Sequence, residues 1–174
     1  MITIIDSLTL EHTVFGHLFH QIESLLPQLT TPQEAQLLGR LVEGILASHG
    51  DREENLAYAA LDQFLANQNE LDCLYQDHEE IDGRLERLRS AATLPEARKL
   101  LKEALHASRQ HFKREELLIF PKLGTAFDEE TLSELSEAWK KWDAVPLKPR
   151  SPARPTGAIP KSAPVARTEQ RTQP

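Results

Sequence analysis

The chain has 174 residues, a hydrophobic fraction of 40% and one cysteine, Cys73. This length suits a single folded domain, and one cysteine excludes an internal disulfide framework and a cysteine-ligated zinc or iron–sulfur site. Residues 1–143 carry 14 Lys/Arg against 26 Asp/Glu, whereas residues 144–174 carry six against one, so we do not expect the acidic part to bind nucleic acid.

All the predicted elements are helices, because apolar residues recur at steps of three and four and no alternating strand pattern occurs. The first helix is predicted to begin after Asp6 or Ser7 and to end near Pro27. Capping boxes predict the starts of two more helices, at residues 31–34 and 93–96.

The helix that starts at residue 93 should continue to about Pro121, and a further helix is predicted from about Asn69 to Ser90. The four helices together predict an all-α fold, an antiparallel up-down-up-down four-helix bundle.

A shorter fifth helix is predicted after Asp128, with an apolar stripe that suits docking against the end of the bundle. The stripe consists of Leu132, Leu135, Trp139 and Trp142, and we interpret the two tryptophans as core. Seven of the eleven prolines follow Val145, so residues 144–174 are predicted to be a disordered, basic, Pro-rich tail beside a domain of residues 1–143. Prolines at every third residue fit either a partner with an aromatic groove or a plain flexible extension.

Two pairs of residues in these helices share a spacing that puts both side chains on one helix face. His49 and Glu53 lie four residues apart, as do His111 and Glu115, so each pair can reach one metal centre together. Both pairs lie within stripes of apolar or small residues and should point into the core. The stripes are Leu38, Val42, Ile45, Leu46 and Leu56 for His49, and Leu100, Leu101, Ala104, Ala107 and Leu118 for His111.

The other two helices contribute one inward histidine each. His12 shares a face with Leu8, Phe15, Phe19, Ile22 and Leu26. His78 is the lone polar group on a seam of Leu71, Leu74, Tyr75, Ile81, Leu85 and Leu88.

Burying four imidazoles and two carboxylates is costly unless something satisfies them, and two divalent cations would do so. The predicted metal ligands are His12, His49, Glu53, His78, His111 and Glu115. The histidines would be terminal ligands and the two glutamates bridges. The alternative is that the histidines are core residues satisfied by hydrogen bonds, without metal. If metal is bound, the donors suit iron, and zinc or manganese are the alternatives to it.

These residues resemble the hemerythrin HHE cation-binding family over roughly Asp6 to Leu123. Glu11-His12 is similar to the opening Glu-His of that family, and residues 49–54 and 111–116 are similar to its two His-x-x-x-Glu-Glu stretches. Residues 119–121 are similar to its following Phe-Pro. The resemblance implies two iron ions with oxo or hydroxo and carboxylate bridges.

One departure from the family concerns His78. Oxygen-carrying hemerythrins have a second histidine four residues away, whereas here Leu74 and Asp82 stand at those positions. Three roles are therefore open for Asp82: a metal ligand, a hydrogen-bond partner of a metal-bound water, or a residue that faces solvent. Two are open for Tyr75: a hydrogen bond to an oxygen species, or packing in the core. The four-His, two-Glu set resembles iron-handling and NO- or peroxide-reactive members more than reversible carriers.

The remaining histidines, His17, His20 and His106, lie 80° to 140° from the ligand faces by helical geometry and are predicted to lie on the surface. Glu54, Glu79, Glu80 and Glu116 are either solvated charges or groups that orient a ligand.

The sequence thus predicts a cytoplasmic non-haem di-iron protein, without membrane association, that binds or reacts with O2, NO or hydrogen peroxide. A di-iron oxidoreductase, a non-catalytic oxygen or iron sensor and a reversible oxygen carrier all remain open, as do a tail partner and the oligomeric state.

Overall fold

The computed structural model describes residues 1–65 and 71–142, and all regular structure within those residues is helical. The all-α prediction is therefore confirmed. The elements are α1 (Ile4–Leu25), the 3-10 helix η1 (Leu26–Gln28), α2 (Pro32–Arg52), the π-helix η2 (Glu53–Tyr58), α3 (Ala59–Asp62), α4 (Asp72–Arg89), α5 (Leu94–Ala126) and α6 (Glu129–Lys141).

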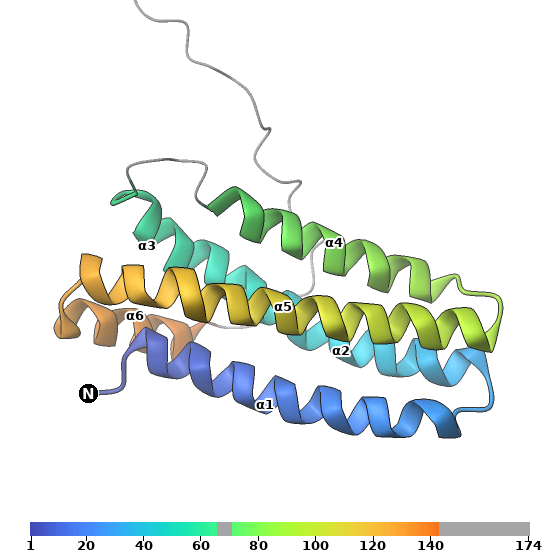
Figure 1. The fold of residues 1–174 in the computed structure, drawn as a ribbon. Helices are drawn as coiled ribbons and strands as arrows, with labels where there is room; N and C mark the ends of the chain where they lie inside the picture. The colour runs from blue at the N-terminus through green and yellow to red at the C-terminus, as the bar shows by residue number, and fades with distance from the viewer. Residues whose placement is uncertain (66–70, 143–174) are drawn as a thin grey trace, which may run out of the picture.

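The long helices α1, α2, α4 and α5 lie side by side and form a helical bundle (Figure 1). The π-helix and α3 continue the line of α2, and α6 packs against α1 and the π-helix near the end where the chain begins. Helix α4 packs most extensively against α5, and α2 packs against both α4 and α5. This arrangement lets four separate helices contribute side chains to one interior.

Three of the helix starts follow the predicted caps. Thr31 forms a complete capping box with Glu34, Thr93 accepts a hydrogen bond from the Glu96 amide, and Asp128 accepts one from the Thr131 amide. Each cap satisfies a backbone donor that the first helical turn leaves without a partner.

The predicted start of the first helix is wrong. The cap is Thr3, and Asp6 lies inside the first turn, where its carboxylate accepts hydrogen bonds from the Thr3 amide and hydroxyl. The predicted cap, Asp6 or Ser7, lies three or four residues after the actual one, because Asp and Ser are themselves good cap residues.

The predicted end of the fourth helix at Pro121 is also wrong, because α5 continues through this proline to Ala126. Ile119, Phe120 and Leu123 are all buried, so packing on both sides of the proline holds the helix together. The cost of a proline inside a helix is thereby outweighed.

The π-helical segment changes which residues of the second helix face inward. With α-helical spacing Leu56 would follow His49 and Glu53 into the core, but Leu56 is only half-buried, whereas Ala57 and Tyr58 are buried. A π-helix adds a residue to the turn and so rotates everything after it. Tyr58 faces the interior as a result.

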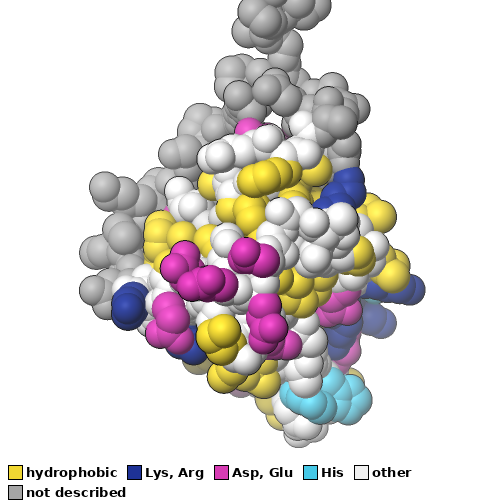
Figure 2. Space-filling view, turned by 90° about the vertical axis from the view of Figure 1, so that its left-hand side faces the viewer, with side chains coloured by type: hydrophobic (Ala, Val, Ile, Leu, Met, Phe, Trp, Pro, Cys, Tyr) yellow, Lys and Arg dark blue, Asp and Glu magenta, His cyan; other side chains and the backbone are white. Residues whose placement is uncertain are grey.

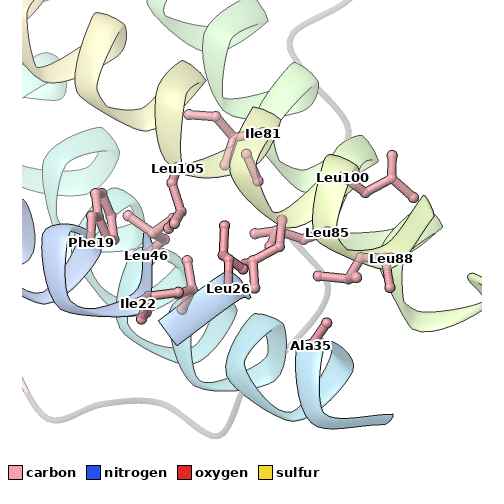
Figure 3. Packing of buried hydrophobic residues seen from close by; sticks show 14 of the residues in the cluster. Phe19, Ile22, Leu26, Ala35, Leu46, Ile81, Leu85, Leu88, Leu100 and Leu105 are labelled. Atoms are coloured by element: carbon pink, nitrogen blue, oxygen red, sulfur yellow. The ribbon is translucent and has the colours of Figure 1, made fainter. Parts of the chain in front are cut away.

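The core consists of two clusters of buried apolar residues. The larger one joins α1, α2, α4 and α5, with Phe19 and Ile22 facing Leu46, Leu85 and residues of α5 (Figure 3). The smaller one joins the start of α1, the π-helix, the end of α5 and α6. The inward stripe of the first predicted helix is confirmed, and so is that of the third except for Tyr75, which is half-buried. Leu118 of the fourth predicted helix is exposed, and Ile119 takes its place.

Several predictions concern the surface or lie outside the described residues. His17, His20 and His106 are exposed as predicted.

The end of the molecule near the N-terminus presents acidic and hydrophobic side chains together (Figure 2). Within the described residues, no helix combines the length and apolarity needed to cross a membrane. The proposed tail, residues 144–174, and the first residues of the predicted third helix lie outside the described residues.

Candidate metal centre

The structure brings all six predicted ligands into one buried cluster. His12 comes from α1, His49 from the last turn of α2, Glu53 from the first position of the π-helix and His78 from α4, while α5 contributes His111 and Glu115. Each is at most 5% exposed, and both glutamates are fully buried. The cluster lies along the bundle between the two apolar clusters.

Glu53 lies at the centre of this cluster. Its Oε1 atom is 2.7 Å from Nε2 of His49 and 3.7 Å from Nε2 of His12. Its Oε2 atom is 3.5 Å from Nε2 of His78 and 3.9 Å from Nε2 of His111. The two carboxylate oxygens therefore face different pairs of histidines.

Glu115 also reaches a histidine of each pair. Its Oε2 atom is 3.3 Å from Nε2 of His12 and 3.4 Å from Nε2 of His111. The possible ligand atoms form two groups that share Glu53: His12, His49, Glu53 and Glu115 in one, and Glu53, His78 and His111 in the other. Two neighbouring cation positions with a common carboxylate fit this arrangement.

Each histidine points its other ring nitrogen, Nδ1, at a carboxylate from a different helix. Nδ1 of His49 is 2.8 Å from Glu11 and Nδ1 of His78 is 2.7 Å from Glu54. The remaining two pairs are His12 with Glu116 at 3.0 Å and His111 with Asp77 at 3.5 Å. At His12, His49 and His78 the carboxylate is within hydrogen-bond distance, so it holds the proton at Nδ1 and leaves the Nε2 lone pair free to bind a metal ion. Nδ1 of His111 is within ion-pair distance of Asp77 but has no hydrogen-bond partner.

Sequence reasoning found only part of this outer shell. Glu54 and Glu116, whose roles were left open, contact ligand histidines, whereas Glu79 and Glu80 are exposed. Glu11 and Asp77 were not proposed as outer-shell groups. Each directly precedes a ligand histidine in the sequence, and that position was the signal that could have found them.

Arginines hold two of these outer carboxylates in place. Arg52 pairs with Glu11 at 3.0 Å, and Arg114 pairs with Asp77. Both arginines stand three residues after a predicted ligand histidine, in the repeated sequence His-x-x-Arg-Glu-Glu at residues 49–54 and 111–116. The two halves of the centre are therefore built in the same way.

The carboxylates dominate the electrostatics of the cluster. Burial alone would lower the pKa of a histidine, but Glu115 and Glu53 outweigh it and raise the pKa of His12 to about 10 and that of His111 to about 9. The pKa of His49 is also raised. Burial would raise the pKa of Glu53, yet the surrounding histidines, His49 foremost, hold it well below its usual range. Positive charge is thus strongly favoured at the centre.

Hydrogen bonds satisfy this cluster only in part. Nε2 of His78 and Nε2 of His111 lie 2.8 Å apart and pair with each other, but other possible ligand atoms have no such partner. Among the residues that the structure describes, Nε2 of His12 and His49, both Glu53 oxygens and Oε2 of Glu115 are buried without a hydrogen-bond partner. Unpaired buried polar atoms are costly, and all five belong to residue types that bind divalent cations. The residues present fit a metal centre.

A family model described as hemerythrin HHE cation binding domain matches residues 3–123. The chain belongs to the hemerythrin HHE cation-binding domain family. No significant match to a curated protein or to a solved structure was found. Membership in a cation-binding family and the His/Glu cluster together identify a metal-binding domain.

A buried tyrosine joins the centre of this HHE domain. The hydroxyl of Tyr58, which is 1% exposed, donates a hydrogen bond to Glu115 Oε1. Burial, followed by the charge of Glu115, raises the pKa of Tyr58 well above its usual value, so its hydroxyl stays protonated. Tyr75 packs its ring edge-on against Tyr58 with centroids 5.7 Å apart. Sequence reasoning missed Tyr58 because its inward direction depends on the π-helix.

Aromatic rings cover the His12 and His49 side of the HHE centre. Phe112 stacks on His12 at 4.2 Å between ring centroids, and Phe15 meets His49 edge-on at 5.1 Å. Trp139 also lies edge-on to His49, at 5.7 Å, and its indole N–H donates to Glu11. Trp139 is a core residue as predicted, and it also braces a carboxylate of the centre. Trp142, which was also interpreted as core, is only half-buried.

Proposed function

We propose that this chain is a non-haem di-iron protein that binds or reacts with O2, NO or hydrogen peroxide. The observation that carries the proposal is the pair of ligand groups that share Glu53, with buried ligand atoms that no hydrogen bond satisfies. In this proposal four histidines are terminal ligands, and Glu53 and Glu115 bridge the two ions. The histidines are His12, His49, His78 and His111.

The donor set supports iron, since imidazole and carboxylate ligands from facing helices form di-iron sites in helical bundles. Zinc and manganese accept the same donors and are the less favoured metals. We also propose that α1, α2 with its extension, α4 and α5 make the antiparallel up-down-up-down four-helix bundle of the hemerythrins.

Bound iron would supply the redox chemistry, and the chain's own residues would prepare the site. The outer carboxylates, Glu11 among them, orient the histidines by holding Nδ1. Tyr58 fixes one oxygen of Glu115 and leaves the other to face His12 and His111. The rings of Phe15 and Phe112 exclude water from the His12 side.

Metal analysis tests the proposal directly. The protein should be purified without added metal, and its metal content and visible spectrum measured before and after addition of azide. Two irons per chain with oxo-bridge absorption bands are expected, and wild-type protein that contains no metal and takes up no Fe(II) would refute the proposal. His17→Gln, which changes an exposed histidine of α1, is the matched control for His12→Gln.

A metal-stabilised sensor or iron-binding module is the second candidate. It is favoured by the origin of the cluster in four long helices, because metal loading would then be coupled to the stability of the whole bundle. Peroxide or NO turnover that is lost in His78→Ala would support the reactive protein. Absence of turnover, together with a large fall in melting temperature on metal removal, would support the sensor.

A further inference from the structure

Helix α6 lies alongside α1 and runs in the same direction (Figure 1). Three contacts join residues that are 128 or 129 positions apart in the sequence: the Met1 amino group with Glu129 at 3.3 Å, Ser7 with Ser136 at 2.8 Å, and Glu11 with Trp139 at 2.9 Å. The two helices therefore keep in step, one residue of α6 to one residue of α1. By this relation Trp142, where α6 ends, comes level with Val14.

The face of α1 that α6 covers continues beyond the end of α6. Residues seven apart in a helix are about two turns apart and point the same way. Seven residues after Ser7 and Glu11, which contact α6, stand Val14 and Leu18. Leu25 comes seven residues after Leu18. Val14, Leu18 and Leu25 are 53%, 38% and 42% exposed, so the second half of this face is apolar and open to solvent.

Helix α2 adds to this apolar surface. Its Arg52 lies over the Trp139 ring at 4.5 Å and pairs with Glu11, so Arg52 points to the line where α1, α2 and α6 meet. Leu41 and Ile45 stand eleven and seven residues before Arg52 and point the same way. Ile45 is half-buried, and Leu41 is 59% exposed. The exposed α1–α2 face consists of Val14, Leu18, Leu25 and Leu41.

The chain that follows α6 is apolar over a matching length. After Asp143 come Ala144, Val145, Pro146 and Leu147, which lie outside the described residues. Prolines at 146 and 149 favour an extended chain for the residues before them. Five extended residues, 143–147, span about 16 Å, which is the length of about 11 helical residues. The exposed α1–α2 face extends over the same length, from Val14 to Leu25.

We propose that residues 144–147 dock on the exposed α1–α2 face and tie the start of the tail to the bundle. This segment is the favoured occupant because it begins beside the face. Its anchor is Trp142, whose indole N–H donates a hydrogen bond to Asp51 at 3.0 Å. A tethered segment has a high effective concentration, so a few apolar contacts suffice to hold it. Docking would also keep α6 in place, and with it the Trp139 that supports Glu11. The proposal does not depend on the metal that the centre binds.

The rate at which trypsin cuts the tail of the full-length protein tests this docking. Trypsin cuts after Lys and Arg except before Pro, so the first bond that it can cut after Leu147 is Arg150–Ser151. The Lys161–Ser162 bond lies farther along the tail. A protease needs an accessible, extended stretch on both sides of the bond that it cuts. Docking of residues 144–147 should therefore slow cleavage after Arg150 and leave cleavage after Lys161 fast.

Two substitutions remove the contact from either side. Leu18→Ser takes an apolar side chain from the face, and Leu147→Ser takes one from the segment. Each should speed cleavage after Arg150 about tenfold and leave cleavage after Lys161 unchanged, because cleavage follows the fraction of the tail that is undocked. The double variant should add little to either single variant, since both remove the same contact. Leu117→Ser is the matched control, because Leu117 is an exposed leucine of α5 outside the face, and it should leave both rates unchanged.

Three results would overturn the proposal. The first is equal cleavage after Arg150 in the wild type, Leu18→Ser and Leu147→Ser. The second is acceleration by Leu18→Ser alone, since the effect would then come from a loosened bundle and not from the tail. The third comes from light scattering, which should show a monomer. A wild-type dimer that Leu18→Ser converts to a monomer would show that a second copy of the chain covers the face.

Discussion

Removal of metal should reverse the way in which the stability of this protein depends on pH. In the metal-free chain the neighbouring carboxylates outweigh burial and raise the pKa of His12 to about 10 and of His111 to about 9, from an ordinary value of 6.5. The folded chain then holds protons that the unfolded chain releases above pH 6.5. The stability from these histidines is complete below that pH and is lost as the pH rises through 9 to 10.

The magnitude follows from the number of protons. Each proton held only by the folded state changes the free energy of unfolding by about 1.4 kcal/mol per pH unit. Two histidines therefore remove about 2.7 kcal/mol between about pH 7.5 and about pH 8.5. This is a large part of the total stability of about 5–15 kcal/mol for a typical domain, and it corresponds to a fall of about 5 °C or more in melting temperature.

Thermal unfolding of chelator-treated protein, followed by circular dichroism from pH 6 to pH 9, measures this change. His12→Gln should reduce the slope and His17→Gln should retain it, because His17 is exposed on the same helix. The metal-loaded protein should show the opposite trend, since metal binding requires neutral histidines. A melting temperature of the metal-free protein that stays level or rises over this range would refute the reasoning.

Three other substitutions have expected outcomes. Trp139→Phe keeps an aromatic ring but loses the donor to Glu11, so iron affinity in a chelator competition should fall by about 10-fold or more, and unchanged affinity would count against this bracing role. Gly39→Ala would make its Cβ clash with Cδ2 of the buried Leu88 and should destabilise the fold by about 1–3 kcal/mol in urea unfolding. Gly44→Ala has open space at its Cβ and should stabilise the fold by about 0.5–1 kcal/mol, so equal effects at both glycines would contradict the close approach of α2 to α4.

The inner cluster could be predicted from the sequence because its residues lie in regular α-helix or directly after it. His49 and Glu53 keep their four-residue relation up to the first position of the π-helix, and His111 and Glu115 lie well inside α5. Periodicity therefore placed their side chains on the correct face. Their proximity across helices followed from the assumption that every inward polar residue shares one interior.

The rest depended on features that periodicity does not carry. Tyr58 faces the centre because a π-helix rotates the chain after Glu53, and no residue in that segment marks such a change. Leu118 and Ile119 stand seven and eight residues after His111, so helical periodicity places either of them near the His111 face. Ile119 is the one that is buried, because it packs in the same cluster as Phe120 and Leu123. Glu11 and Asp77 point sideways to a neighbouring helix, a direction that depends on how the helices pack.

The four carboxylate–histidine pairs have a consequence for the order in which the chain is made. Glu11 of α1 is hydrogen-bonded to His49 of α2, and Glu54 after α2 to His78 of α4. Asp77 of α4 lies at ion-pair distance, 3.5 Å, from His111 of α5. The last link runs from Glu116 of α5 back to His12 of α1, and so closes a ring around the bundle. During synthesis this ring stays open until residue 116 has emerged, so a nascent chain cannot assemble the complete centre before most of α5, residues 94–126, has been made.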